Sequence, residues 1–230
     1  MNRIKPYQEN KYHVTNVDKQ IFLCKYKNLI RVDKNAINGH YYVSSLYFDT
    51  DDFDFYMDKQ EGEFFKIKIR IRRYSNDKFS WSAPRLEIKM KVAEETIKVS
   101  KWITEEEYLK LTCIPVSGYE ILKYLEWNNK CPEDSLLNKV YKTKAKVFYD
   151  REAYSFLNLP SLRLTFDHNI YATKINDNMP YCFSEINNIF EIKSDIKMPL
   201  IFSEWLKDKS IIQEHISKYS IAIEKLFIIA

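Results

Sequence analysis

Glycine is scarce in this chain of 230 residues, which has three copies, Gly39, Gly62 and Gly118. None of them stands in the patterns GxxxxGKT, GxxxxGKS or GxGxxG, in which backbone amides wrap around a phosphate. The sequence therefore excludes a P-loop and a dinucleotide-binding loop. A phosphate-binding site in this protein would have to be built from side chains.

Cysteine is also scarce, and its four copies never approach the CxxC spacing of a zinc site or a redox pair. We expect Cys24, Cys113, Cys131 and Cys182 to be buried free thiols in a reducing cytoplasm. The four histidines show no metal-binding spacing such as HExxH. These absences argue against a zinc site and a redox pair, and we assign no histidine a role in catalysis.

Long apolar runs and a strong charge excess are both missing. No stretch approaches the roughly 20 apolar residues of a membrane span, and no apolar leader follows Met1. We expect a cytoplasmic protein with no membrane span of its own, which a membrane-protein partner could tether. Lys and Arg outnumber Asp and Glu by 36 to 32, an excess too small to indicate a nucleic-acid partner, and we expect none.

What the chain does have is apolar and aromatic material for a core, at 45% and 15% of its residues. No linker or repeat interrupts it, so we expect one domain over residues 1–230. Thr104 and Glu107 form a capping-box pattern that predicts a helix to about Leu111. Other predicted helices start at Asn16, cover 53–59 and 119–127, start near Leu200 and reach the C-terminus. Predicted strands cover 9–14, 41–48, 65–74, 84–92, 96–100, 144–154, 161–167 and 181–193.

The strand 65–74 alternates between cations and isoleucine. Side chains two residues apart on a strand share a face, so Lys66, Lys68, Arg70 and Arg72 form one row while three isoleucines form the other. For a single strand, a solvent-facing row of charge is the ordinary interpretation. The pattern nevertheless recurs in five more strands, as Glu9 with Lys11, Glu87 with Lys89 and Lys91, Tyr149 with Arg151, Arg163 with Thr165 and Asp167, and Glu191 with Lys193.

Rows of like charge repel one another on an exposed sheet. If the sheet closes with its charged faces inside, a bound polyanion balances the repulsion. We therefore predict an α+β fold: a closed antiparallel β-barrel of about eight strands, forming a tunnel, with helices packed outside. Such a tunnel fits a triphosphate or polyphosphate chain, whose charges and acceptor oxygens need matching donors when water is displaced.

Eight segments, in order along most of the chain, resemble the VTC domain of the triphosphate-tunnel superfamily, whose members make or handle inorganic polyphosphate. The segments are ENKY at 9–12, SLYFDT at 45–50, KIRIRRY at 68–74, LEIKMK at 86–91, VFYDR at 147–151, LRLTFD at 162–167, FEIK at 190–193 and SKY at 217–219. The resemblance implies ATP-dependent synthesis of inorganic polyphosphate inside the tunnel, with ATP and polyphosphate as ligands.

The resemblance also implies roles for individual residues. Phosphate-binding cations match Lys11, Arg70, Arg72, Lys89, Arg151, Arg163 and Lys218, and a phosphate-contacting hydroxyl matches Tyr149. Glu191 matches a ligand of Mn²⁺ or Mg²⁺, which Glu9 and Glu87 would assist. His215 stands where the family usually has a cation, and Lys98 aligns loosely with a later lysine. From the strand pattern we add Lys68, Lys91 and Lys193 as substrate contacts.

Two other functions are compatible with the same residues. A triphosphate or polyphosphate hydrolase would use the cations and metal with water as nucleophile, but its usual ExExK opening is replaced here by Glu9-Asn10-Lys11, with one carboxylate fewer. A non-catalytic module would hold polyphosphate or a nucleotide for a partner. We favour phosphoryl transfer because it needs no carboxylate to activate water.

Overall fold

The computed structural model describes residues 6–34, 36, 39–93, 95–126, 134–175, 177, 180–183, 188–196 and 198–229. Its strands are β1 (Gln8–Val14), β2 (Ile30–Val32), β3 (His40–Asp49), β4 (Phe65–Ser75), β5 (Arg85–Val92), β6 (Glu95–Trp102), β7 (Val116–Ser117), β8 (Val140–Phe156), β9 (Leu159–Lys174), β10 (Tyr181–Cys182) and β11 (Asn188–Ser194). Its helices are α1 (Asn16–Tyr26), α2 (Asp54–Gln60), α3 (Glu105–Cys113), α4 (Gly118–Tyr124), α5 (Asp134–Leu137), α6 (Leu200–Asp208) and α7 (Lys218–Ile223), which continues as a π-helical turn over Glu224–Ile228.

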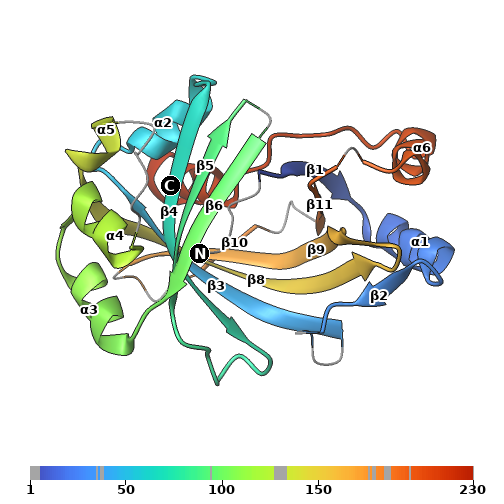
Figure 1. The fold of residues 1–230 in the computed structure, drawn as a ribbon, viewed down its shortest axis with the longest axis horizontal. Coiled ribbons are helices and arrows are strands. Elements are labelled where there is room, and N and C mark those ends of the chain that lie inside the picture. Colours follow the sequence, from blue (N-terminus) through green and yellow to red (C-terminus); the bar gives the residue numbers. More distant parts are fainter. Residues whose placement is uncertain are drawn as a thin grey trace.

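One curled antiparallel sheet forms the centre of the molecule (Figure 1), with the strand order β1-β11-β9-β8-β3-β4-β5-β6. The α+β class is confirmed, but the predicted closed barrel is wrong: the sheet is a half-barrel of eight strands with β1 and β6 at its edges. Within the described residues these edges meet at one bridge, where Tyr7 and Thr96 exchange backbone hydrogen bonds of 3.1 and 3.0 Å.

The C-terminal segment explains why the ladder does not close. Further along the same strand, Tyr12 forms a bridge with Gln213, and the carbonyl of Lys11 accepts a hydrogen bond of 2.9 Å from the amide of Glu214. The C-terminal segment therefore lies along this part of the β1 edge, where a ladder with β6 would have to continue. The edge is shared between two partners instead of forming a ladder with one.

Alternation along the strands separates the two faces of the sheet, as predicted. The apolar face of β4 and β5, which includes Ile69, Ile71 and Leu86, is buried in a core on the side of α2, α3, α4 and α5 (Figure 1). A second core gathers Phe22 of α1 and Trp205 of α6 against β9 and β11. The charged residues of the same strands face the concave side, so the two cores fix the direction in which the cations point.

Local signals predict the helix starts well. Thr104 and Glu107 form the expected capping box, with hydrogen bonds of 2.7 and 3.1 Å between each side chain and the other backbone amide. The helix predicted over 119–127 begins at Gly118, where Ser117 and Glu120 form a second capping box, and it ends at Tyr124. Residue 127 lies outside the described residues.

Several sequence expectations are wrong. Strands β2 and β7 and helix α5 were not predicted, because two to four residues give too short a pattern to recognise. The strand predicted over 181–193 is two strands, β10 and β11. Three cysteines are exposed rather than buried: Cys24 on α1, Cys113 at the end of α3 and Cys182 on β10. Cys131 lies outside the described residues.

Candidate functional site: a cation-lined central cavity

The inward-facing side chains of the half-barrel surround a central cavity of about 50 Å³. Strands β1, β3, β4, β5, β6, β8 and β11 and helix α7 all contribute to it. Its nine cations are Lys11, Lys68, Arg70, Arg72, Lys89, Lys98, Arg151, Lys193 and Lys218. The cavity is small because these side chains pair across it with a few carboxylates, and the pairs fall into three clusters.

The first cluster lies on β4, β5 and β6 around Glu87, which is fully buried. Arg70 contacts one carboxylate oxygen at 2.7 and 2.8 Å, and Lys98 contacts the other at 2.6 Å. Burial alone would raise the pKa of Glu87, but Arg70, Arg72 and Lys98 hold it well below its usual range. Glu87 is therefore an anion that gathers three cations on one wall.

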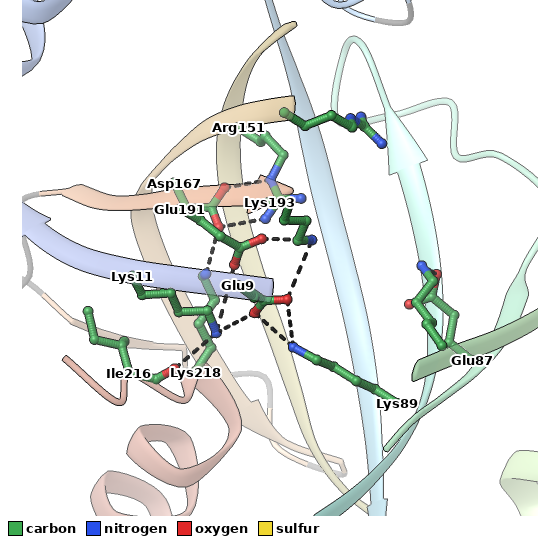
Figure 2. Close-up of polar contacts among 12 residues, drawn as sticks. Glu9, Lys11, Glu87, Lys89, Arg151, Asp167, Glu191, Lys193, Ile216 and Lys218 are labelled. Atoms are coloured by element: carbon green, nitrogen blue, oxygen red, sulfur yellow. Dashed lines mark hydrogen bonds and ion pairs between the residues drawn. The ribbon is translucent and has the colours of Figure 1, made fainter. Parts of the chain in front are cut away.

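The second cluster lies on β1 and β11 (Figure 2) and joins two carboxylates through two ammonium groups. Lys11 lies 3.0 Å from Glu9 and 3.7 Å from Glu191, while Lys193 lies 2.7 Å from Glu191 and 3.9 Å from Glu9. Lys89 reaches across from β5 to both oxygens of Glu9 at 2.7 Å. Figure 2 shows Glu87 apart from this cluster, so Glu9 and Glu191 are the two carboxylates that face each other.

The third cluster contains a residue to which the sequence analysis gave no role. Asp167 of β9 is fully buried and contacts Arg151 through both oxygens, at 2.6 and 2.7 Å, and Lys218 at 2.6 Å. The ring of Tyr149 lies beside the same two cations, 5.2 Å from Arg151 and 4.8 Å from Lys218. The alternation of Arg163, Thr165 and Asp167 placed this carboxylate on the charged face but did not identify its partners.

The remaining predicted residues border the cavity from two separate sides. A pocket of about 540 Å³ contains Lys91 and His215 and shares Lys68 and Lys89 with the central cavity. A pocket of about 290 Å³ contains Arg163 and shares Lys98 and Lys193 with it. The two pockets have no lining residue in common, so they adjoin the central cavity from two separate sides, which we call its two openings.

Arg163 occupies a different environment from the central cations. Its side chain is 48% exposed, and it pairs with Asp33 at 2.8 Å. The structure thus places Arg163, Lys91 and His215 at the openings, whereas the other predicted cations, Tyr149, Glu9 and Glu191 line the central cavity. Sequence reasoning missed Tyr7, Tyr47, Ser217 and Tyr219 as lining residues; the last two lie in the SKY segment at 217–219, which was a usable signal.

Burial lowers the pKa of several lysines in this cavity. Burial lowers the pKa of Lys89 to about 8 and that of Lys98 to about 7, although Glu9 and Glu87 respectively oppose the effect. Lys68, which donates a hydrogen bond of 2.7 Å to Ser217, has a pKa well below its usual value because of burial and of Lys11 and Lys89 nearby. The protein alone therefore holds some of these amines with incomplete charge at neutral pH.

A curled antiparallel sheet with a cation-lined concave face is the architecture of the triphosphate-tunnel proteins. The family model for the VTC domain matches residues 6–227, and the chain belongs to this family, as the sequence segments predicted. A comparison with curated proteins found no match. Within the part of the chain that the structure describes, no helix is long and apolar enough to cross a membrane.

Solved structures with the same fold include a candidate adenylyl cyclase from Hippeastrum with a dominant triphosphatase activity, at 13% identity and a TM-score of 0.54 over 98% of each chain. A candidate adenylate cyclase from Bacillus halodurans matches at 16% identity and a TM-score of 0.51 over 97% of each chain. Another from Vibrio parahaemolyticus matches at 12% identity and a TM-score of 0.50 over 95% of this chain and 99% of its own. At these identities the likeness concerns the fold.

Proposed function

We propose that this protein lengthens inorganic polyphosphate, using ATP as the phosphoryl donor, inside the central cavity. The observation that carries the proposal is a charge imbalance. Nine cations line the cavity, while the carboxylates that pair with them are four: Glu9, Glu87, Asp167 and Glu191. Uncompensated buried charge is costly, and a chain of phosphates supplies the missing negative charge together with many acceptor oxygens.

Phosphoryl transfer suits a site of this composition because positioning and charge neutralisation supply most of the catalysis. A terminal oxygen of the polyphosphate chain would form the new P–O bond to the γ-phosphorus of ATP. The bond between that phosphorus and the β,γ-bridging oxygen would break, and ADP would leave with the electron pair. The nucleophile is already an anion, so no general base is required.

We assign phosphate binding to the cations of the three clusters and to Tyr149. Arg70, Arg72 and Arg151 carry charge at any working pH and present forked donors to phosphate oxygens. The guanidinium groups of Arg70, Arg72 and Arg151 donate hydrogen bonds to Glu87, Ser45 and Asp167 respectively, so they stay ordered without the ligand. Arg163, Lys91 and His215 would guide the chain at the two openings.

Glu9 and Glu191 are the residues that fit a divalent cation. The two carboxylates lie side by side, and the ammonium groups of Lys11 and Lys193 bridge them. Glu9 and Glu191 thus bind positively charged groups in common, as they would bind a metal ion. Among the described residues no three His, Cys, Asp or Glu side chains converge on one metal site, so phosphate oxygens would complete the coordination. Mn²⁺ or Mg²⁺ bound here would neutralise charge on the transferred phosphate.

A triphosphate hydrolase is the second candidate, favoured by the fold shared with the Hippeastrum protein and its triphosphatase activity. Hydrolysis needs a positioned water and a carboxylate to orient it. The carboxylates that line the cavity, Glu9 and Glu191, are both bound to lysines. Transfer to a phosphate needs no carboxylate to activate water, which is why we favour it.

The test is incubation of the purified protein with ATP and Mn²⁺ or Mg²⁺, followed by separation of polyphosphate, inorganic phosphate and ADP. Polymer in proportion to ADP supports the proposal, and its loss in Arg70→Met and Glu191→Gln ties it to the cavity. Phosphate without polymer selects the hydrolase. Tight polyphosphate binding with no turnover, unaffected by Glu191→Gln, would instead indicate a non-catalytic binding module.

A further inference from the structure

Asp49 is a buried carboxylate beside the central cavity whose partners differ from those of the cavity carboxylates. It ends β3, has no solvent exposure, and accepts hydrogen bonds from the amides of Thr50 (2.8 Å) and Phe55 (3.0 Å). It also accepts a short hydrogen bond from the hydroxyl of Tyr219. Among the described residues, Asp49 thus faces amides and a hydroxyl, whereas the other buried carboxylates of this region face cations.

The amide contacts have a local explanation. Helix α2 starts after Phe53, which has a left-handed backbone (φ 59°) and offers no side-chain cap. Asp49 replaces the missing cap by accepting from the first amides of the helix, where a negative charge is also favourable. This role requires the carboxylate but does not require Tyr219.

The contact with Tyr219 connects Asp49 to the cavity. Tyr219 and Lys218 are adjacent at the start of α7, and successive side chains on a helix point about 100° apart. When the Tyr219 hydroxyl is held by Asp49, the Lys218 side chain is directed at Asp167, 2.6 Å away. The Tyr219 ring also stacks on Tyr47 at 5.1 Å.

Helix α7 depends on tertiary contacts for its orientation because it is short, even with the π-helical turn that continues it. Ala222 and Ile223 pack in the larger core, and the hydroxyl of Tyr219 adds a polar contact of fixed direction. The buried hydrogen bond between Asp49 and Tyr219 joins α7 to β3 and α2, two elements that are fixed in the larger core. It therefore limits how far Lys218 can move away from the cavity.

We propose that Asp49 and Tyr219 are positioning residues of the phosphate site: their hydrogen bond orients α7 so that Lys218 reaches a bound phosphate chain. The inference rests on the proposed function in one respect, that Lys218 binds phosphate. It adds that Asp49, which does not line the cavity, and the hydroxyl bonded to it determine how well Lys218 does so.

A double-mutant cycle tests this with inorganic tripolyphosphate as the probe and calorimetric titration as the readout. Tyr219→Phe removes the hydroxyl and keeps the ring stacked on Tyr47. We expect it to weaken tripolyphosphate binding by about threefold or more in the wild-type background and by less than about twofold when Lys218 is already Met, because the two residues act through one contact. An equal loss in both backgrounds, or none in the first, would overturn the proposal.

Two controls keep the result specific. The loss caused by Tyr219→Phe should persist in a Lys89→Met background, because Lys89 lies on β5 and pairs with Glu9 rather than with Asp167. Tyr26→Phe removes a comparable buried hydroxyl, bonded to the carbonyl of Ile201 in the second core, and should leave binding unchanged. Binding that becomes weaker in Tyr26→Phe as well would mean that general destabilisation, not positioning, is responsible.

If Tyr219→Phe does not fold, Asp49→Asn provides the same cycle, because the amide oxygen still accepts from α2 while the charge that orients the hydroxyl is lost. The proposed function is tested separately by Lys218→Met alone. Wild-type affinity in that variant contradicts phosphate binding by Lys218, whereas a large loss that does not depend on Tyr219 contradicts only the positioning role.

Discussion

Lys98 is the residue whose charge depends most directly on what the cavity contains. Its amine lies 2.6 Å from Glu87 but is buried beside Arg70 and Arg72, and the balance lowers its pKa to about 7. A bound polyanion would add negative charge next to this amine and favour its protonated form. Binding above this pKa must therefore be accompanied by protonation of Lys98.

We accordingly expect the Kd for tripolyphosphate to increase as the pH rises from about 6.5 to 8.5. The fold increase in Kd should be about ten times larger in the wild type than in Lys98→Arg. Arginine keeps its charge throughout this range, so the variant is the matched control. Lys89, with a pKa of about 8, contributes at the upper end in both proteins. Calorimetry in two buffers of different ionisation enthalpy measures the proton uptake, and equal pH dependence of the two proteins would contradict the assignment.

Asp167 is the residue on which the third cluster depends. Without its carboxylate, Arg151 and Lys218 would remain buried at 7% and 8% exposure with no anion between them. We expect Asp167→Asn to lower the free energy of unfolding by about 3 kcal/mol, measured by urea denaturation. Tripolyphosphate should recover part of this loss, because it supplies an anion at the same place.

The control for this substitution is Asp51→Asn. Asp51 also pairs with two cations, Lys142 and Lys144, but on the surface, where water screens the interaction. We expect no measurable change in stability. A similar stability for the Asp167 and Asp51 variants would show that burial does not decide the strength of these pairs.

At the scale of elements, Gly118 sets how closely α4 approaches α5. A Cβ atom at this position would lie 1.9 Å from the carbonyl oxygen of Leu136, which is a backbone atom and cannot rotate away. We expect Gly118→Ala to lower the free energy of unfolding by about 2 kcal/mol through this clash. Thermal denaturation measures it, with Tyr119→Ala as the control, because Tyr119 is the next residue and is 66% exposed.

These helices pack on the outside of the sheet, away from the cavity. If Gly118→Ala were to weaken tripolyphosphate binding as much as it lowers stability, the outer helices would have to influence the concave face. The separation of the two faces of β4 and β5 argues that they do not: Ile69 and Ile71 face the outer core, and Arg70 and Arg72 face the cavity. We therefore expect the affinity at low temperature to be unchanged.

For the whole molecule, the excess of cations in the cavity predicts a ligand-dependent stability. Tripolyphosphate at a hundredfold excess over its Kd should raise the free energy of unfolding by about 2.7 kcal/mol, because it binds the folded protein alone. Raising the salt concentration should reduce the affinity. Differential scanning fluorimetry with inorganic phosphate at the same concentration is the control, and equal stabilisation by both anions would argue against a site for a chain.

The sequence predicted the direction of the side chains better than the closure of the sheet. Arg70 and Ile71 alternate within one strand, so their faces follow from local geometry and from the need to bury isoleucine. Closure of the sheet depends on which backbone partner pairs with the free edge of β1. That edge is shared between Thr96 and Gln213, both more than 80 positions away along the chain. No local pattern encodes that competition, which is why a closed barrel was predicted and a half-barrel is found.

The candidate site likewise has features that follow from the sequence and features that only the tertiary structure decides. The sequence by itself determined the family, the residues of the charged faces and the absence of a glycine-rich phosphate loop, because each is a property of composition or of spacing two residues apart. Only the tertiary structure decided that Asp167 joins Arg151 to Lys218, that Glu9 faces Glu191, and that Arg163 lies at an opening. Such pairings depend on burial and on distances between strands and helices that fold together from remote parts of the chain, so spacing along the sequence does not specify them.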